Sequence, residues 1–243
     1  MEKQTVDAVR SLAARDEQYT ATYAPVSVEL VDHMGSDLSV VNAARVSFSK
    51  LSALEEGGTL SERDKKLIDF LAKHNHWSPF GHAFASFRIK ASIVVARQLV
   101  KHAVGLCWNE VSRRYVSYEP EVFAVDAWRG RPANVKQGSG GEPGMPVSEV
   151  DALYNDVCNK AVDAYNKLVE GGVAPEQARL ILPQGAMTEW IWSGSLAAFA
   201  RVCKLRCAKD TQLESQQVAN GIAEHMSRLF PVSFESLLSH WLK

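Results

Sequence analysis

Residues 83–102 read AFASFRIKASIVVARQLVKH, and the period of the apolar positions changes within this stretch. In residues 83–91, apolar Phe87 and Ile89 alternate with charged residues, which predicts a β-strand with one buried face. The second half has helical spacing instead, with an apolar stripe made by Ile93, Ala96, Val100 and Val104. A strand that leads directly into a helix, with polar residues gathered at the helix end, is a common way to build a pocket.

Helical spacing and capping residues recur along the rest of the chain. They predict helices that begin at Ser39, Ser61 and Ser195 and helices over 150–168, 176–182 and 213–230. Residues 190–192 are short and β-like. Residues 119–148 contain four prolines, and we expect a surface loop or lid there and not a domain boundary. The predicted fold class is α+β, with helices packed around a modest, mostly antiparallel sheet in a single domain spanning 1–243.

The composition is that of an ordinary globular protein, with 243 residues of which 46% are hydrophobic and 23% charged. The formal net charge is -1. Binders of long nucleic acids usually carry a surplus of Lys and Arg, so this charge disfavours the DNA-binding protein that the basic helix around Arg97 and Lys101 would otherwise suggest. A local basic pocket for one phosphate stays open, because net charge says nothing about distribution.

Targeting and metal-binding signals are missing from the sequence. The first 26 residues are charged throughout and have no apolar core of a signal peptide, and no apolar run approaches the ~18 residues of a membrane span. The four cysteines form no Cys-x-x-Cys pair and fit reduced thiols better than a disulfide framework. His74, His76 and His82 match no common zinc spacing, so we predict no metal site. We expect a cytoplasmic protein that does not bind membranes.

Long polar side chains gather near the end of the helix predicted after residue 92. On such a helix Arg97 and Lys101 are four residues apart, as are Gln98 and His102, so the four would line one broad face. The apolar stripe lies on the opposite side. This face is the first candidate for a polar site.

A second candidate is formed by Glu110, Ser112 and Arg114, which would point the same way if their segment is extended. A carboxylate, a hydroxyl and a guanidinium together suit a nucleoside monophosphate, because Arg and Ser would hold the phosphate and Glu would accept a ribose hydroxyl. An exposed, salt-bridged strand fits the same residues. Arg179 and Arg206 lie among apolar residues, where each needs an anion or an internal ion pair.

Around these positions the chain resembles the flavin-dependent thymidylate synthases, the ThyX family. The family signature is Arg-His-Arg, a short spacer and Asn-Glu-x-Ser-x-Arg-Tyr. Here it reads Lys101-His102-Ala103, then Asn109-Glu110-Val111-Ser112-Arg113-Arg114-Tyr115. Further similar stretches, in the family's order, run from Val28 to Phe230 and include His76-x-Ser78-Pro79-Phe80-x-His82, Ala96-Arg97-Gln98, Ala178-Arg179-x-x-Leu182-Pro183 and Leu205-Arg206.

The resemblance implies a catalytic domain that methylates dUMP to dTMP, with FAD as cofactor and with NADPH and 5,10-methylenetetrahydrofolate as co-substrates. It implies a homotetramer whose sites are shared between subunits. Arg206 would polarise the uracil ring as the catalytic residue. The implied dUMP-binding residues are Gln98, Lys101, Glu110, Val111, Ser112, Arg113, Arg114, Arg179 and Arg206. The implied FAD-binding residues are His76, Ser78, Lys101, His102, Ala103, Glu110, Ser195 and Arg201.

The chain departs from the family pattern mainly on the flavin side. Lys101 keeps a charge but loses the guanidinium fork, and Ala103 loses the charge. Ser195 and Arg201 stand where the family often has Asn, and Lys136 or Arg201 would replace the missing charge. FAD would bind without a Rossmann loop, because the sequence has no G-x-G-x-x-G. A related enzyme that makes a hydroxymethylated pyrimidine and a non-catalytic nucleotide-binding relative stay open as alternatives.

Overall fold

A four-stranded antiparallel sheet forms the centre of the protein, described here by a computed structural model over residues 20–132 and 138–241. Its strand order is β2-β3-β6-β4. The strands are β2 Ser27–Met34, β3 Phe84–Ser92, β6 Met187–Ser195 and β4 Leu106–Glu110. The strand predicted from the alternating residues is confirmed as β3, which pairs on both sides because it lies inside the sheet. The α+β prediction is also confirmed.

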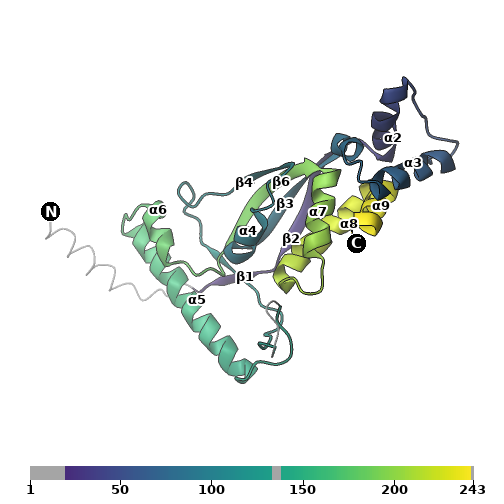
Figure 1. The fold of residues 1–243 in the computed structure, drawn as a ribbon. Helices are drawn as coiled ribbons and strands as arrows, with labels where there is room; N and C mark the ends of the chain where they lie inside the picture. The colour runs from purple at the N-terminus through teal and green to yellow at the C-terminus, as the bar shows by residue number, and fades with distance from the viewer. Residues whose placement is uncertain (1–19, 133–137, 242–243) are drawn as a thin grey trace.

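One face of the sheet is covered by helices α7 Leu196–Arg206 and α8 Leu213–Leu229, with the short α4 Ile93–Leu99 beside them (Figure 1). Phe87 of β3 and Trp192 of β6 are fully buried there against Phe199 of α7, at ring-centroid distances of 5.1 and 5.6 Å. Burying each large apolar side chain contributes roughly 1.5–3 kcal/mol. This packing fixes the sheet against the helices that carry the candidate site.

The other face of the sheet is polar, as the alternation in β3 requires. Arg88 Nε donates to the Glu189 carboxylate of β6 at 2.8 Å, and the hydroxyls of Ser86 and Ser193 lie 2.7 Å apart. Beside the sheet, β1 Thr22–Ala24 and β5 Glu121–Phe123 form a parallel pair. The segment predicted as an irregular loop therefore contributes one short strand. Its residues 133–137, with Lys136, lie outside the described residues.

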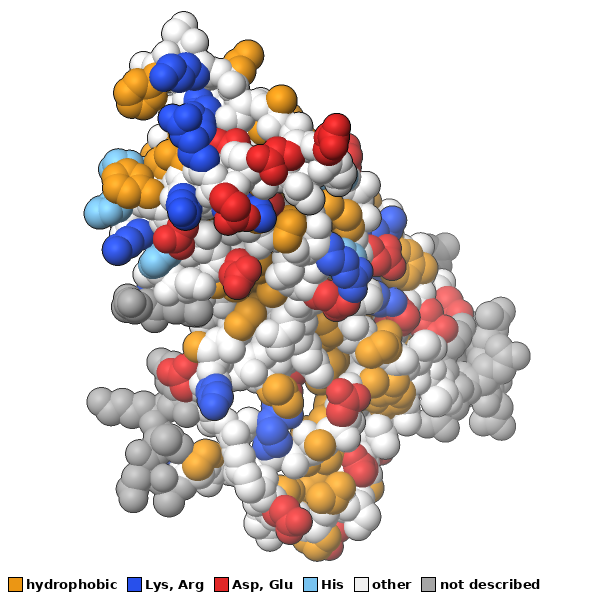
Figure 2. All heavy atoms as spheres, turned by 90° about the vertical axis from the view of Figure 1, so that its right-hand side faces the viewer, with side chains coloured by type: hydrophobic (Ala, Val, Ile, Leu, Met, Phe, Trp, Pro, Cys, Tyr) orange, Lys and Arg blue, Asp and Glu red, His pale blue; other side chains and the backbone are white. Residues whose placement is uncertain are grey.

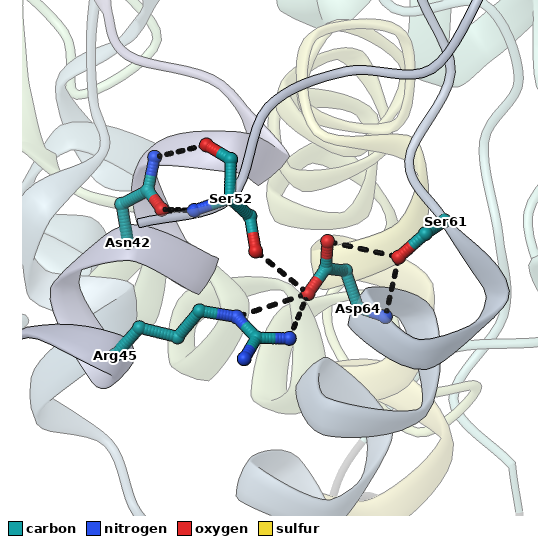
Figure 3. A network of polar contacts seen from close by, with 5 residues as sticks. All are labelled: Asn42, Arg45, Ser52, Ser61 and Asp64. Atoms are coloured by element: carbon teal, nitrogen blue, oxygen red, sulfur yellow. Dashed lines mark hydrogen bonds and ion pairs between the residues drawn. The ribbon is translucent and has the colours of Figure 1, made fainter. Parts of the chain in front are cut away.

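A helical lobe extends from one end of the sheet (Figure 1). It consists of α2 Asp37–Arg45, the 3-10 turn η1 Val46–Phe48, α3 Glu62–Lys73 and α9 Pro231–Trp241. Buried Asp64 accepts hydrogen bonds from Arg45 Nε at 3.1 Å, Ser52 Oγ at 3.0 Å and Ser61 Oγ at 2.9 Å (Figure 3). This network ties the long loop between α2 and α3 to both helices.

Two predicted helix starts are confirmed and one is corrected. Ser61 and Ser195 are the N-caps of α3 and α7, and each side chain accepts a backbone N–H. Ser39 is not the N-cap: α2 begins at Asp37 with Ser36 as its N-cap, and Ser39 accepts the Ser36 N–H with its hydroxyl at 3.0 Å, as the third residue of a capping box does. The predicted cap was one turn late because either serine alone offers the same local signal.

The opposite end of the protein carries the long helix α5 Val147–Glu170, followed by α6 Pro175–Ala178 and the 3-10 turn η3 Arg179–Ile181 (Figure 1). The helix predicted after residue 92 is shorter than expected, because α4 ends at Leu99. The chain then turns, and the His102 N–H bonds the Leu99 carbonyl at 3.0 Å. Val104, predicted on the apolar stripe, is 77% exposed. Within the described ranges, no helix combines the length and apolarity that crossing a membrane requires.

Candidate active site

Glu110 is the last residue of edge strand β4, and both of its carboxylate oxygens are held. Oε1 accepts a hydrogen bond from Thr188 Oγ1 at 2.8 Å, and Oε2 accepts one from Trp108 Nε1 at 3.2 Å. The Trp108 indole stacks on Trp190, with 4.3 Å between ring centroids. The carboxylate is thus oriented at an exposed strand end, where its remaining lone pairs can accept a ligand hydroxyl.

Ser112 and Arg114 lie in a turn, so the extended segment under which Glu110, Ser112 and Arg114 would point the same way is not formed. Val111 donates its backbone N–H to β6 at 2.8 Å, but strand β4 ends at Glu110, and beyond it no ladder keeps the chain extended. The turn still places Arg114 Nε 3.0 Å from Ser112 Oγ. The hydroxyl and the guanidinium expected to share a phosphate are therefore neighbours.

Arg113 and Arg179 are held differently. The Arg113 guanidinium donates to the Tyr118 carbonyl at 2.8 Å and lies over the ring of Tyr118 and near that of Tyr165 in α5, so its side chain is engaged in packing. Arg179 is exposed in η3, and the prediction that it sits among core residues is wrong because a 3-10 turn replaces the expected helix. Over residues 20–132 and 138–241, Arg179 makes no ion pair, which leaves its charge open to an anion.

Arg206 at the end of α7 bonds His102, across 104 positions of sequence. Its Nε donates to Nε2 of the imidazole at 2.9 Å, which requires an unprotonated Nε2. Burial, and then the positive charge of Arg206, lower the pKa of His102. The pair is therefore a neutral imidazole and a charged guanidinium whose terminal nitrogens can still donate to a ligand.

Gln98 in α4 accepts a hydrogen bond from the hydroxyl of buried Ser215 in α8, which fixes its amide and leaves the nitrogen able to donate. Lys101 and Ala103 follow in the exposed turn after α4. The predicted helical face of four polar side chains is therefore wrong, because only Arg97 and Gln98 are helical. His102 reaches the site from the turn instead.

A basic cavity of about 460 Å³, here called the α7 cavity, opens beside this turn. Arg201 and Lys204 of α7 line it, and Arg201 also donates to the Val104 carbonyl at 3.1 Å, which joins the cavity to the turn. Trp77, 57% exposed, offers it an aromatic face. The remaining lining residues are Ala72, Lys73, Asn75, His240 and Trp241. Cations beside an exposed indole suit a diphosphate joined to a flat ring.

Three predicted flavin residues do not line the α7 cavity: two of them are neighbours of Trp77 in sequence, and the third lies at the start of α7. His76 and Ser78 flank Trp77, with Ser78 opening the 3-10 turn η2 Ser78–His82. Ser195 uses its hydroxyl to accept the Ala198 N–H at 3.2 Å, so it caps α7. Gly105, at φ +75°, passes so close to this helix start that a Cβ would lie 3.3 Å from the Ala198 Cβ. The glycine lets the signature turn approach α7 closely.

Within one chain the predicted residues form two groups. Glu110, Ser112 and Arg114 lie at the end of β4, whereas Gln98, His102 and Arg206 lie where α4, α7 and α8 meet. The described residues contain no hydrogen bond or ion pair that joins Arg179 to either group. Among the described residues, no three His, Cys, Asp or Glu side chains lie close enough together to hold a metal ion.

Several partners in these groups carry no local sequence signal. Thr188 and Ser215 hold Glu110 and Gln98, but both are ordinary residues of a strand and a helix. Lys204 and Trp77 reach the α7 cavity from distant parts of the sequence. A clue existed only for Trp77, which lies between two residues of a recognisable stretch. Such contacts depend on tertiary packing.

The fold of the chain is similar to that of a solved pyrimidine nucleotide methylase. The protein is similar to a UMP/dUMP methylase, PolB, from Streptomyces cacaoi, crystallised with 5-Br dUMP: 28% of residues are identical, the TM-score is 0.78, and the match covers 90% of this chain and 97% of that one. The same enzyme with 5-Br UMP gives a TM-score of 0.79.

The family model of the thymidylate synthase complementing protein, Thy1, matches residues 29–232. Flavin-dependent thymidylate synthases of Thermus thermophilus and Kosmotoga olearia are each 38% identical to this chain. The matches cover 89% and 87% of this chain and 77% and 90% of the two relatives. The chain belongs to the flavin-dependent thymidylate synthase family.

Proposed function

We propose that this protein catalyses the reductive methylation of dUMP to dTMP, with FAD as cofactor, 5,10-methylenetetrahydrofolate as carbon donor and NADPH as reductant. The observation that carries the proposal is the set at the end of β4. There, Thr188 and Trp108 hold the carboxylate of Glu110. Ser112 and Arg114, which follow two and four residues later in the sequence, are hydrogen-bonded to each other. A carboxylate, a hydroxyl and an arginine together match the ribose and phosphate of a nucleotide.

In this proposal the two groups of side chains act on different parts of dUMP. Glu110 accepts a ribose hydroxyl, and Ser112, Arg114 and Arg179 hold the phosphate. Val111 and Arg113 position the turn. Gln98 donates its amide to the base, with Lys101 adding positive charge. These contacts orient the nucleotide and exclude water before any bond changes.

Arg206 is the proposed catalytic residue. Its Nε donates to His102, and this bond orients the guanidinium. The two terminal nitrogens remain free to donate to a ligand. Directed at a uracil carbonyl oxygen, they stabilise negative charge that develops on the ring when a ring carbon becomes nucleophilic. The imidazole of His102 must be neutral at Nε2 to accept the bond from Arg206 that orients the guanidinium. No cysteine of the chain is needed as a nucleophile.

The proposed flavin site uses His76, Ser78, Lys101, His102, Ala103, Glu110, Ser195 and Arg201. The cationic and aromatic lining of the α7 cavity supports it, because FAD carries a diphosphate and flat rings. FAD held by these residues would supply hydride chemistry and the chemistry for moving a one-carbon unit from folate to the pyrimidine. Arg201 is the natural replacement for the charge lost at Ala103, since it already bonds the turn that carries Ala103.

We also propose that the protein is a cytoplasmic homotetramer. Among the described residues of one chain, the two groups of dUMP residues are connected through rings: Trp108 bonds Glu110, and Trp192 lies 5.4 Å from Trp108 and 6.5 Å from His102 between ring centroids. A site shared between subunits would complete these groups with residues of another copy. All four cysteines are free thiols, which suits a reducing compartment.

The decisive experiment is anaerobic turnover with labelled methylenetetrahydrofolate, dUMP and NADPH, followed by the mass of the product. A mass increase for one methyl group supports the proposal. A hydroxymethyl product would instead identify a related hydroxymethylase, and dUMP binding without NADPH oxidation would identify a non-catalytic relative. Because the similar enzyme PolB acts on UMP as well as dUMP, UMP is tested in parallel.

A further inference from the structure

The helical lobe carries a second basic cavity, outside the residues assigned above. It lies between α2, η1 and α3 and has a volume of about 460 Å³. In Figure 2, which faces this end of the molecule, Lys and Arg side chains gather in the upper part beside exposed hydrophobic ones. We call it the lobe cavity; its lining residues are Ala44, Arg45, Phe48, Lys50, Arg63, Lys66, Leu67 and Phe70.

The cations of the lobe cavity are largely unneutralised. Arg45 is paired with Asp64, and Lys66 interacts electrostatically with the exposed Glu62, but over the described residues the side chains of Lys50, Arg63 and Lys66 make no hydrogen bond or close ion pair. Three such cations around one hollow, on a chain whose net charge is -1, create a local positive potential that attracts a multiply charged anion.

Two exposed phenyl rings complete the cavity. Phe48 is 74% exposed and Phe70 is 50% exposed, although both are large apolar side chains that gain from being covered. The backbone of the loop that follows Phe48 is held by hydrogen bonds. The Asn42 side chain bonds both backbone groups of Ser52 at 2.7 and 3.1 Å, which holds the loop after η1 in place (Figure 3). A cavity of this size with two phenyl faces suits a flat heteroaromatic ring.

The lobe cavity adjoins the proposed flavin site. The Phe70 ring that lines it lies 4.3 Å from the ring of His74 and 6.0 Å from that of His76, measured between centroids. His76 is one of the proposed flavin residues. Phe70 therefore lies between the lobe cavity and a proposed flavin residue, and a ligand that extends past Phe70 would reach the flavin site.

We propose that the lobe cavity binds the adenosine half of the nicotinamide reductant. Its adenine packs against Phe48 and Phe70, and its 2′-phosphate is held by Lys50, Arg63 and Lys66. The inference rests on the proposed function, because it assigns the reductant of that reaction. It predicts selectivity for NADPH over NADH, since only NADPH carries the dianionic 2′-phosphate. A folate would satisfy the cations with its glutamate carboxylates and could cover one phenyl face with its p-aminobenzoyl ring, so it is the alternative occupant that the test below separates from the reductant.

The test is calorimetric titration of the FAD-loaded protein with adenosine 2′,5′-bisphosphate and, separately, with adenosine 5′-monophosphate. We expect the bisphosphate to bind at least ten-fold more tightly, and the double variant Arg63→Gln/Lys66→Gln to lose that advantage. The NADPH KM of the double variant should rise ten-fold or more, and its NADH KM should not. Lys65→Gln is the matched control, because Lys65 is on the same helix but is paired with Glu62.

The two proposals fail in different ways. Equal affinity for the two adenosine nucleotides, or unchanged bisphosphate binding by the double variant, overturns the assignment of the lobe cavity, even if dTMP is formed. So does a change in oligomeric state of the double variant, measured by light scattering, because the face would then be a subunit contact. Displacement of the bisphosphate by a polyglutamate peptide would assign the cavity to an anionic tail instead. Bisphosphate binding without dTMP formation overturns the proposed function and leaves the adenosine site standing.

Discussion

Replacing Asp64 by Asn should destabilise the protein strongly, although the two side chains have the same shape. Asp64 is 3% exposed and is the common acceptor for Arg45, Ser52 and Ser61 (Figure 3). The substitution removes the only negative charge in this network and leaves the guanidinium of Arg45, itself mostly buried, without its counter-ion. The loop that forms one wall of the lobe cavity keeps its bonds to Asn42 but has a weaker acceptor for the Ser52 hydroxyl.

The magnitude follows from burial. Removing one partner of a buried ion pair costs about 3–5 kcal/mol. The lower figure, about 3 kcal/mol, applies here because Arg45 retains some solvent contact and can regain water. For a chain of this size each kcal/mol lowers Tm by roughly 2–4 °C, so a decrease of roughly 6–12 °C is expected.

The dependence on pH has a definite sign. Burial alone would raise the pKa of Asp64, but hydrogen bonds from Arg45, Ser61 and Ser52 outweigh it and hold the pKa below its ordinary value. A depressed carboxyl pKa contributes stability above the unfolded value of about 3.9, and this contribution is lost as pH falls through the folded value. The difference between wild type and variant should therefore be full at neutral pH and shrink in acid.

Urea unfolding followed by circular dichroism, at one fixed protein concentration, measures the effect. Asp156→Asn is the matched control, because its pair with Lys160 is exposed on α5 and should contribute at most about 0.5 kcal/mol. If Asp64→Asn were as stable as this control, the network would be no more than a surface arrangement and the reasoning from burial would fail.

Three further predictions concern the signature turn and α7. Arg206→Gln should lower kcat about 100–1000-fold, since it removes the proposed charge stabilisation; near-normal dTMP formation in a steady-state assay would refute the role. The same variant should raise the pKa of His102 towards its ordinary value, measured by NMR titration, because one of the two causes of its depression is removed while burial remains. In wild type this depressed pKa means that the stability from neutral His102 is full above about pH 6.5 and declines below it. Gly105→Ala should lower Tm more than Gly172→Ala, because both have positive φ but only Gly105 faces a neighbouring Cβ, and a cost of about 1–2 kcal/mol is expected; equal melting temperatures would contradict the close approach.

Much of the secondary structure could be predicted because its signals are local. The alternation around Phe87 and Ile89 predicted β3, and Ser61 and Ser195 predicted the starts of α3 and α7. Prediction failed where a distant contact decides the outcome. Helix α9, for example, was not predicted. The backbone N–H groups of Val232 and Ser233, in its first turn, donate to the carboxylate of Asp37, which lies near the start of the chain. The residue that caps this helix is therefore not its neighbour in sequence.

The family, the nucleotide-type residues and the absence of a Rossmann loop were determined by the sequence, because a signature depends only on residue type and spacing. Folding alone decided which of those residues meet. It ended α4 at Leu99 and thereby brought His102 to Arg206 from a turn and not from a helix face. It also made Arg179 exposed and collected basic residues from separate elements around two cavities. The physical reason is range: periodicity and capping act within a few residues, whereas a site is made by side chains that packing brings together across the whole chain.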